Sequence, residues 1–251
     1  MTESFPKGVT AENRRLIGVT ALPPLEEMGE QILTVLKGSD MPLHFIAVDP
    51  NYCFPTSKRR DNYSGYEPEG ILKCNWFEKH VFQLPSVLLA VLPFEPSLSD
   101  NEWKKREGSL QKDVQKVYEQ IQGNKIKLVV ILLQERDYSQ SQESKERLQL
   151  AKERILSLRR QVDLDSKSVH LLYTSDLNLK SDSVKKILSS ANSMSIDCIK
   201  ADGKQGKHMR TSVSIGGMPK KSQIVLKIRQ SVKLGQFYDM RHEETKAKKE
   251  Y

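Results

Sequence analysis

Residues 66–95, YEPEGILKCNWFEKHVFQLPSVLLAVLPFE, join an aromatic segment to the most apolar run of the chain. That run, residues 86–94, is rich in leucine and valine, has no alternation with polar residues, and is bounded by Pro93 and Pro96. Such a run is typical of a strand that is covered on both faces. It therefore predicts a central strand of a parallel sheet.

The aromatic segment ahead of this strand, residues 70–80, places large apolar side chains beside charges and is too short for a long helix. One interpretation is a recognition loop at an edge of the sheet. The other is that Trp76 and Phe77 cover an open end of the core, which the usual burial of aromatic side chains favours.

Four other apolar runs predict strands, at residues 14–22, 43–48, 126–133 and 168–174. Helical periodicity covers residues 25–37, 99–122, 140–162 and 184–191. Parallel strands need crossover connections, so this order of elements predicts an α/β fold. We expect an open, mostly parallel five-stranded sheet of Rossmann-like or flavodoxin-like type, with flanking helices and the strand order 2-1-3-4-5.

The predicted α/β domain covers residues 1–198. Residues 199–222 lose the periodic pattern and fill with glycine, lysine and serine, which predicts a flexible basic insert. Residues 223–251 predict a C-terminal helix, the start of a longer helical region, with an apolar stripe of Ile224, Ile228, Val232 and Tyr238. We expect this stripe to dock in part on the sheet domain. The polar residues 241–250 should fray.

The composition is that of a soluble protein, with 37% hydrophobic and 29% charged residues. No apolar run approaches the roughly 18 residues that a membrane span requires, and the N-terminus has no secretory signal pattern. The three cysteines, Cys53, Cys74 and Cys198, are widely spaced and form no CxxC pair. This usage fits reduced thiols and predicts a cytoplasmic protein.

The net charge of +8 lies in the C-terminal fifth of the chain. Residues 200–251 hold 13 Lys and Arg against 5 Asp and Glu, so residues 1–199 are neutral, with 27 of each kind. This asymmetry predicts contact with an anionic surface, such as a membrane, a nucleic acid or an acidic protein. A solvated basic helix is an equally good interpretation.

Phosphate-binding motifs are absent from the sequence. The first strand is followed by Pro23 and Pro24, which lack the amide donors that a phosphate would need, and neither GxGxxG nor GxxxxGK[ST] occurs. A nucleotide cofactor is therefore not expected.

Catalytic and metal-binding patterns are also absent. The five histidines, His44, His80, His170, His208 and His242, are dispersed, and no GxSxG motif occurs. Two of them, His44 and His170, lie in predicted strands and are interpreted as hydrogen-bonded core residues. Cys74 and His80 are the closest possible nucleophile and base, whereas Asp49 and Asp176 follow two strands and are typical turn caps. We expect no enzyme activity, no catalytic residues, no cofactor and no metal.

A spaced set of aromatic residues and glycines resembles the N-terminal region of the TRAPP complex subunit 11 family, the foie gras family of vesicle-tethering subunits. The residues concerned are Gly70-Ile71-Leu72-Lys73, Trp76, Lys79-His80, Pro85, Trp103, Gln122-Gly123 and Leu133-Gln134. The end of the chain, QFYDMRHEETKAKKEY, is also similar to that family. Family members are much longer, so the resemblance implies a fragment or a short isoform, in which residues 177–222 are an insertion.

The resemblance implies a non-catalytic subunit that binds other TRAPP subunits and acts in endoplasmic reticulum to Golgi transport and in autophagy. It also implies a location in the cytoplasm, peripheral to the Golgi apparatus. A different class of function remains open from the sequence: a nucleotide- or RNA-binding α/β module that uses Lys58-Arg59-Arg60 and the basic C-terminal third.

Overall fold

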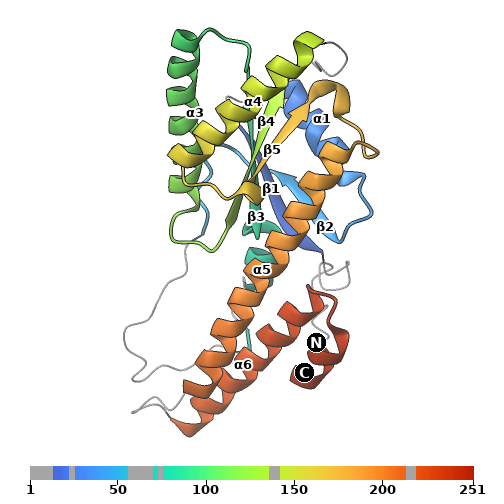
Figure 1. Ribbon diagram of the computed structural model, residues 1–251. Coiled ribbons are helices and arrows are strands. Elements are labelled where there is room, and N and C mark those ends of the chain that lie inside the picture. The colour runs from blue at the N-terminus through green and yellow to red at the C-terminus, as the bar shows by residue number, and fades with distance from the viewer. Residues whose placement is uncertain (1–13, 23–25, 56–69, 73–75, 136–141, 213–218) are drawn as a thin grey trace.

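A five-stranded parallel sheet forms the centre of the protein (Figure 1). The computed structural model describes residues 14–22, 26–55, 70–72, 76–135, 142–212 and 219–251. The strands are β1 (Arg15–Ala21), β2 (Leu43–Ala47), β3 (Val87–Pro93), β4 (Lys127–Gln134) and β5 (Val169–Tyr173). Their order is β2-β1-β3-β4-β5, with every neighbouring pair parallel, which confirms the predicted fold class and strand order.

The central strand is β3, as its apolar run predicts. It pairs with β1 on one side and with β4 on the other, and its residues 87–92 have no exposed surface. Because side chains alternate along a strand, Leu88, Ala90 and Leu92 point to one face of the sheet, and the intervening valines and Leu89 to the other.

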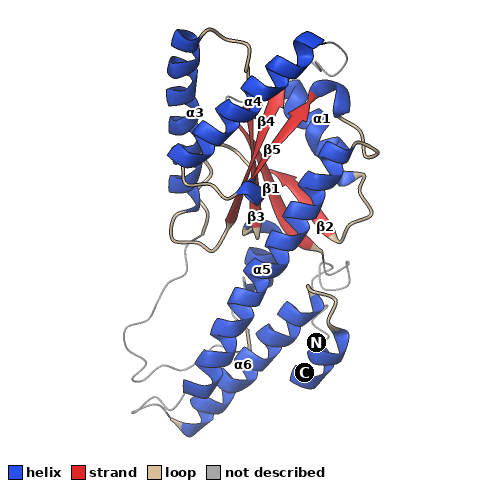
Figure 2. Ribbon diagram, in the orientation of Figure 1, coloured by secondary structure: helices blue, strands red, loops and turns tan. Residues whose placement is uncertain are grey.

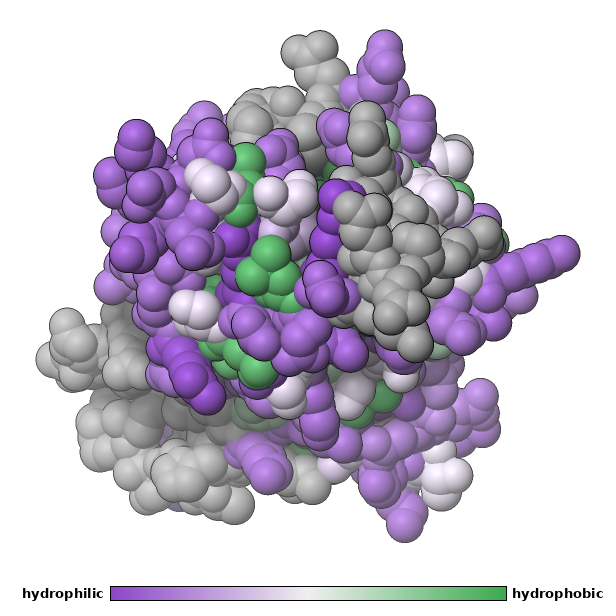
Figure 3. All heavy atoms as spheres, turned by 45° about the horizontal axis from the view of Figure 1, so that its top comes forward, coloured by the Kyte–Doolittle hydropathy of each residue, from purple (hydrophilic) through white to green (hydrophobic). Residues whose placement is uncertain are grey.

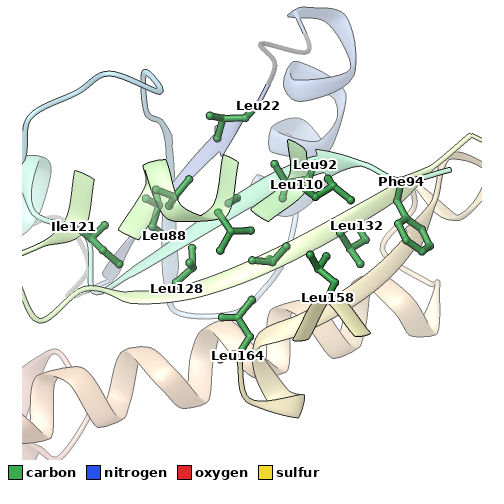
Figure 4. Packing of buried hydrophobic residues seen from close by; sticks show 14 of the residues in the cluster. Leu22, Leu88, Leu92, Phe94, Leu110, Ile121, Leu128, Leu132, Leu158 and Leu164 are labelled. Carbon is green, nitrogen blue, oxygen red and sulfur yellow. The ribbon is translucent and has the colours of Figure 1, made fainter. Parts of the chain in front are cut away.

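Helices cover both faces of the sheet (Figure 2). One face packs on α3 (Asp100–Ile121) and α4 (Gln142–Gln161), and the other on α1 (Glu26–Lys37) and the first half of α5 (Asp182–Ser212). Figure 4 shows the first of these two cores, in which leucines of β3 and β4 meet Leu110 of α3 and Leu158 of α4. The two cores together bury the apolar positions that the strand and helix patterns define.

Local signals set the ends of α3. The backbone N–H and the hydroxyl of Ser99 donate to the Glu102 carboxylate, at 3.1 Å and 2.6 Å, which stabilises the first turn and lowers the pKa of Glu102. After the helix, Gly123 adopts a φ of 80°, a conformation that other residues reach at a steric cost.

The segment after β5 differs from the prediction of a flexible insert at residues 199–222. Helix α5 continues without interruption to Ser212, and α6 (Lys220–Asp239) then packs beside its second half, beyond the lower edge of the sheet in Figure 1. Glycine in a helix costs about 1 kcal/mol relative to alanine. Here Gly203 is buried where α5 packs against Leu234 of α6. Tertiary packing therefore overrides a weak helical pattern.

The C-terminal end is also folded differently from the single helix predicted over residues 223–251. The chain leaves α6 through a turn in which His242 has a φ of 57°, and α7 (Glu244–Glu250) then packs back on α6. Ala247 is 1% exposed and contacts Leu234 and Tyr238. The expectation that residues 241–250 lack tertiary packing is wrong, because Ala247 packs on α6 and both Arg241 and Lys246 lie against the ring of Tyr238.

The predicted apolar stripe of α6 is wrong at Ile224 and Ile228, whereas Tyr238 is buried and Val232 is half-buried. Ile224 and Ile228 are 58% and 44% exposed, whereas the buried positions include Leu226, Arg229 and Phe237. A buried arginine on the packed face shifts the true stripe away from the one that hydrophobicity alone indicates. The predicted limits of the domains remain a prediction.

Truncating a core leucine should destabilise this fold far more than truncating an exposed one. Leu132 of β4 has no exposed surface, and Leu156 of α4 is 45% exposed. We expect Leu132→Ala to lower the free energy of unfolding by about 2–5 kcal/mol and Leu156→Ala by less than about 1 kcal/mol. Urea denaturation measures both values, and equal losses would contradict the described packing of β4.

Candidate interaction site where the C-terminal helices meet the sheet

The carboxyl edge of the sheet, where α/β proteins usually bind ligands, does not bring Asp49 and Asp176 together. Asp49 follows β2 and Asp176 follows β5, the two outer strands, so four strand spacings of about 4.8 Å separate the strands that carry them. The Asp49 carboxylate accepts the Asn51 N–H at 2.7 Å, and Asp176 accepts the Ser183 hydroxyl at 3.3 Å. Both acids therefore hold local turns rather than a shared substrate.

The surface around this edge is mainly hydrophilic where the described residues are visible. Figure 3 brings the top of the molecule forward and shows purple hydrophilic residues around a few separate green hydrophobic ones. A small-molecule site is usually a concave pocket with a mostly apolar lining. The visible described surface does not match that kind of lining.

The opposite edge, where the strands begin, holds a buried arginine that connects three elements. Arg15 begins β1 and is 2% exposed. Its guanidinium donates to Ser195 Oγ at 2.8 Å, to Asn192 Oδ1, and to the Met240 carbonyl at 2.7 Å. Burial lowers the pKa of Arg15, but arginine stays protonated in proteins. The charge thus ties the first strand to α5 and to the end of α6.

A second buried arginine holds α6 from its other side. Arg229 is 4% exposed and donates to the carbonyl oxygens of Gly70 and Ile71, both at 2.7 Å. Gly70 has a φ of 73°, in the left-handed region that favours glycine. Residues 70–72 thus form part of the support for α6.

Aromatic packing fills the space between these two arginines. Trp76 lies in the helical turn α2 (Trp76–Glu78), which leads into the π-helical turn η2 (Lys79–Gln83). Its ring centroid is 5.9 Å from that of Phe237 in α6 and 4.7 Å from that of His80. Trp76 also packs with Ile199 and Met240. Of the two interpretations of this segment, coverage of a core is the correct one for Trp76, and that core belongs to the C-terminal helices.

The region where α5 and α6 meet the amino edge of the sheet is called the junction. It contains a small cavity of about 40 Å³, whose lining includes His80, Lys125, Cys198 and Asp202. Small-molecule sites usually measure at least about 300 Å³, so this cavity has room for water rather than for a cofactor. Burial raises the pKa of the Cys198 thiol to about 12, and its Sγ donates to the Lys125 carbonyl at 3.2 Å. A thiol in this state is not a nucleophile.

His80 is similarly unsuited to base catalysis at neutral pH. Burial lowers its pKa to about 4, and the nearby Asp202 raises it by less than burial lowers it. The predicted partner of His80, Cys74, lies outside the described residues, as do Lys58, Arg59 and Arg60. The His80 ring instead packs on Trp76 and Phe237.

Of the two histidines that were predicted to be hydrogen-bonded core residues, one is hydrogen-bonded and the other is exposed. His170 of β5 contacts Ser190 Oγ at 3.0 Å and the Lys167 carbonyl at 3.1 Å, which confirms a hydrogen-bonded role. His44 is wrong as a core residue, because it lies on the edge strand β2 and its side chain is exposed. Among the described residues, no group of three or more His, Cys, Asp or Glu could hold a metal ion. In the same residues, no helix is long and apolar enough to cross a membrane.

Comparison with known proteins identifies the central part of this fold. Residues 62–181 match the family model of the trafficking protein particle complex subunit 11 N-terminal domain. Those residues form a region like the N-terminal domain of subunit 11. Over 141 residues the chain is 28% identical to trafficking protein particle complex subunit 11 of chicken (Gallus gallus), of cattle (Bos taurus) and of human (Homo sapiens). The aligned segment is 56% of this chain and 12% of each relative.

The subunit 11-like region contains the aromatic support of the junction and the half of the sheet from β3 to β5. Trp76, His80 and the carbonyl groups that bind Arg229 lie inside it, whereas Arg15 and the helices α6 and α7 lie outside. The matched residues do not include 223–251, so the likeness of that end to the family remains a prediction. The sequence carried no signal that Arg15 and Arg229 are buried, because their burial depends on contacts with residues far away in the chain.

Removing the Arg15 guanidinium should loosen the junction. We expect Arg15→Met to lower the free energy of unfolding by about 2–3 kcal/mol, because it leaves the buried acceptors of α5 and α6 unpaired. Arg14→Met removes the same charge from an exposed neighbour and should cost less than about 0.5 kcal/mol. Urea denaturation and hydrogen exchange of residues 220–250 test the pair. Equal effects of the two variants would show that Arg15 does not hold the junction.

Acid should weaken the same junction through His80. Its pKa is near 6.5 when unfolded and about 4 when folded, so the unfolded state gains the proton first as the pH falls. His80 therefore supports folding above pH 6.5, and this support is lost as the pH falls towards 4. Between pH 7.5 and pH 5 we expect wild type to lose about 2 kcal/mol more than His80→Leu, from the linkage relation. Unfolding midpoints at both pH values measure this, and parallel losses would mean that His80 titrates normally.

Proposed function

We propose that this chain is a non-catalytic subunit, or part of one, of a TRAPP-type vesicle-tethering complex. Its partners would be other subunits of that complex, and its site of action the cytoplasm at the periphery of the Golgi apparatus. We assign it to endoplasmic reticulum to Golgi transport and to autophagy. The observation that carries the proposal is the match of residues 62–181 to the subunit 11 N-terminal domain.

The chemistry of the described residues supports binding rather than catalysis. Asp49 and Asp176 follow the two outermost strands of the sheet, and burial raises the pKa of the Cys198 thiol, which lines the same cavity as His80, to about 12. The junction cavity is too small for a substrate. Each of these observations favours a scaffold whose function lies on its outer surface.

The outer face of α4 is the best candidate for the protein contact. It lies inside the subunit 11-like region and exposes two leucines, Leu148 at 41% and Leu156 at 45%. Lys152 lies between them on the helix and is also exposed. Two exposed leucines within one turn of a lysine form a small apolar surface with a polar margin, and in protein interfaces a few buried side chains carry most of the affinity.

An RNA-binding role is less well supported. Sequence-independent RNA binding needs exposed aromatic rings on which bases can stack. In the basic C-terminal third, Phe237 and Tyr238 are 8% and 6% exposed, so their rings are occupied by protein. Tyr251 is 65% exposed, but one exposed ring does not provide the series of rings on which successive bases stack.

Affinity capture of the tagged chain, co-expressed with the other subunits of a vertebrate trafficking protein particle complex, tests the proposal. We expect those subunits to be retained, and Leu148→Glu/Leu156→Glu to reduce their recovery at least tenfold, since loss of two apolar anchors costs about 2 kcal/mol or more. Ile224→Glu/Ile228→Glu places the same change on exposed residues outside the matched region and should leave recovery unchanged. Recovery of none of the subunits by the wild-type chain would refute the proposal.

A further inference from the structure

An exposed apolar ridge with basic flanks lies on the free side of α6. Ile224 and Ile228 are 58% and 44% exposed and stand one helical turn apart. Three exposed lysines, Lys220, Lys221 and Lys227, surround them on the same helix. These five side chains are named the lysine–isoleucine face. An exposed apolar patch that is rimmed by polar residues is the kind of surface that marks an interaction site.

This face points away from the other described elements that pack on α6. The residues of α6 that pack inward, including Leu226, Arg229 and Phe237, lie on the other side of the helix. Further along the same ridge, Gly235 is seven residues from Ile228 and is covered by Tyr251, which follows α7. A β-carbon at Gly235 would lie only 2.7 Å from Tyr251 Cε1. Helix α7 therefore covers the ridge at one end and leaves its isoleucines exposed at the other.

A basic groove lies beside the covered end of the ridge. It has a volume of about 540 Å³ between α5, α6 and α7. Five cationic side chains and two acidic ones, Glu243 and Glu250, line it; the cations are Lys200, Lys204, Arg241, Lys246 and Lys249. Glu243 is already paired with Lys246 at 2.6 Å and with Arg241. Among the described residues, Lys204 and Lys249 have no ion-pair partner, so the groove adds positive charge to the same side of the helices.

We propose that the lysine–isoleucine face binds an anionic lipid bilayer. The two isoleucines enter the boundary between headgroups and acyl chains, and the lysines contact lipid phosphate and carboxylate groups. A helix that lies on a membrane has this combination of apolar residues along one line and lysines at its sides. The long lysine side chains reach the headgroups while the apolar ridge is buried. The groove supplies further attraction to anionic headgroups.

The shape of the surface favours a bilayer over an acidic protein. A partner helix usually binds in an apolar groove, whereas Ile224 and Ile228 form a ridge on the free side of α6. A bilayer is deformable and accepts a ridge without a complementary shape. The inference rests on residues outside the subunit 11-like region, so it stands or falls separately from the proposed tethering function.

Flotation of the full chain with lipid vesicles tests the proposal. The probes are vesicles of phosphatidylcholine alone and vesicles of phosphatidylcholine and phosphatidylserine in equal amounts. We expect flotation only with the anionic vesicles, and weaker flotation at high salt, which screens the lysines. Lys220→Gln/Lys221→Gln/Lys227→Gln should weaken binding roughly 100-fold. Ile224→Ser/Ile228→Ser should weaken it roughly 30-fold, because about half of each side chain is available for burial.

Matched variants on the α4 helix provide the control. Leu148→Ser/Leu156→Ser removes two exposed leucines, and Lys152→Gln removes an exposed lysine, from a face that we do not assign to lipid. These variants should float as the wild type does, and all variants should remain folded, with the far-ultraviolet circular dichroism of the wild type. Equal flotation with neutral vesicles, or undiminished binding by both α6 variants, would overturn the proposal. Binding of polyglutamate in place of the anionic vesicles would overturn it in favour of an acidic protein.

Discussion

The buried guanidinium of Arg15 is the contact on which the arrangement of the two parts of the molecule depends. A buried charge needs all of its donors satisfied, because leaving it unpaired in a low-dielectric interior costs several kcal/mol. Its acceptors belong to α5 and to the carbonyl of Met240, which lies 225 residues further along the chain. The sheet and the C-terminal helices cannot separate without exposing or stranding this charge. The first residue of the first strand therefore constrains the position of the end of α6.

This constraint also decides which edge of the sheet is occupied. The C-terminal helices close the amino edge, where Arg15, Trp76 and the small cavity lie. Ligand sites of open α/β sheets lie at the carboxyl edge, outside the ends of the strands. A familiar scaffold has thus been extended at the edge that such proteins seldom use for binding. The extension adds surface, as the proposed binding of large partners requires.

The sheet was predictable from the sequence because its signals are local and strong. The apolar run of β3 and the capping box of α3 each involve residues close together in the chain, and the right-handed crossover rule leaves few strand orders. The C-terminal helices were misjudged because their packed face is not apolar in the usual sense. It contains Arg229, Ser222 and the buried Gly203, whereas the prominent isoleucines lie outside. Hydrophobic periodicity therefore pointed to the wrong side of α6, and only long-range contacts could correct it.

The continuity of α5 has a mechanical consequence. A helix of 31 residues is about 46 Å long. Its first half is embedded in the core through Val184, Ile187 and Leu188, and its second half carries α6 through Ile199 and Gly203. The helix is thus one continuous rod that is anchored in the core of the sheet at one end. A force on the far end of the helix pair α5–α6 therefore acts as a torque on the packing of α5 against the sheet. The unbroken helix transmits this force between the two parts of the molecule.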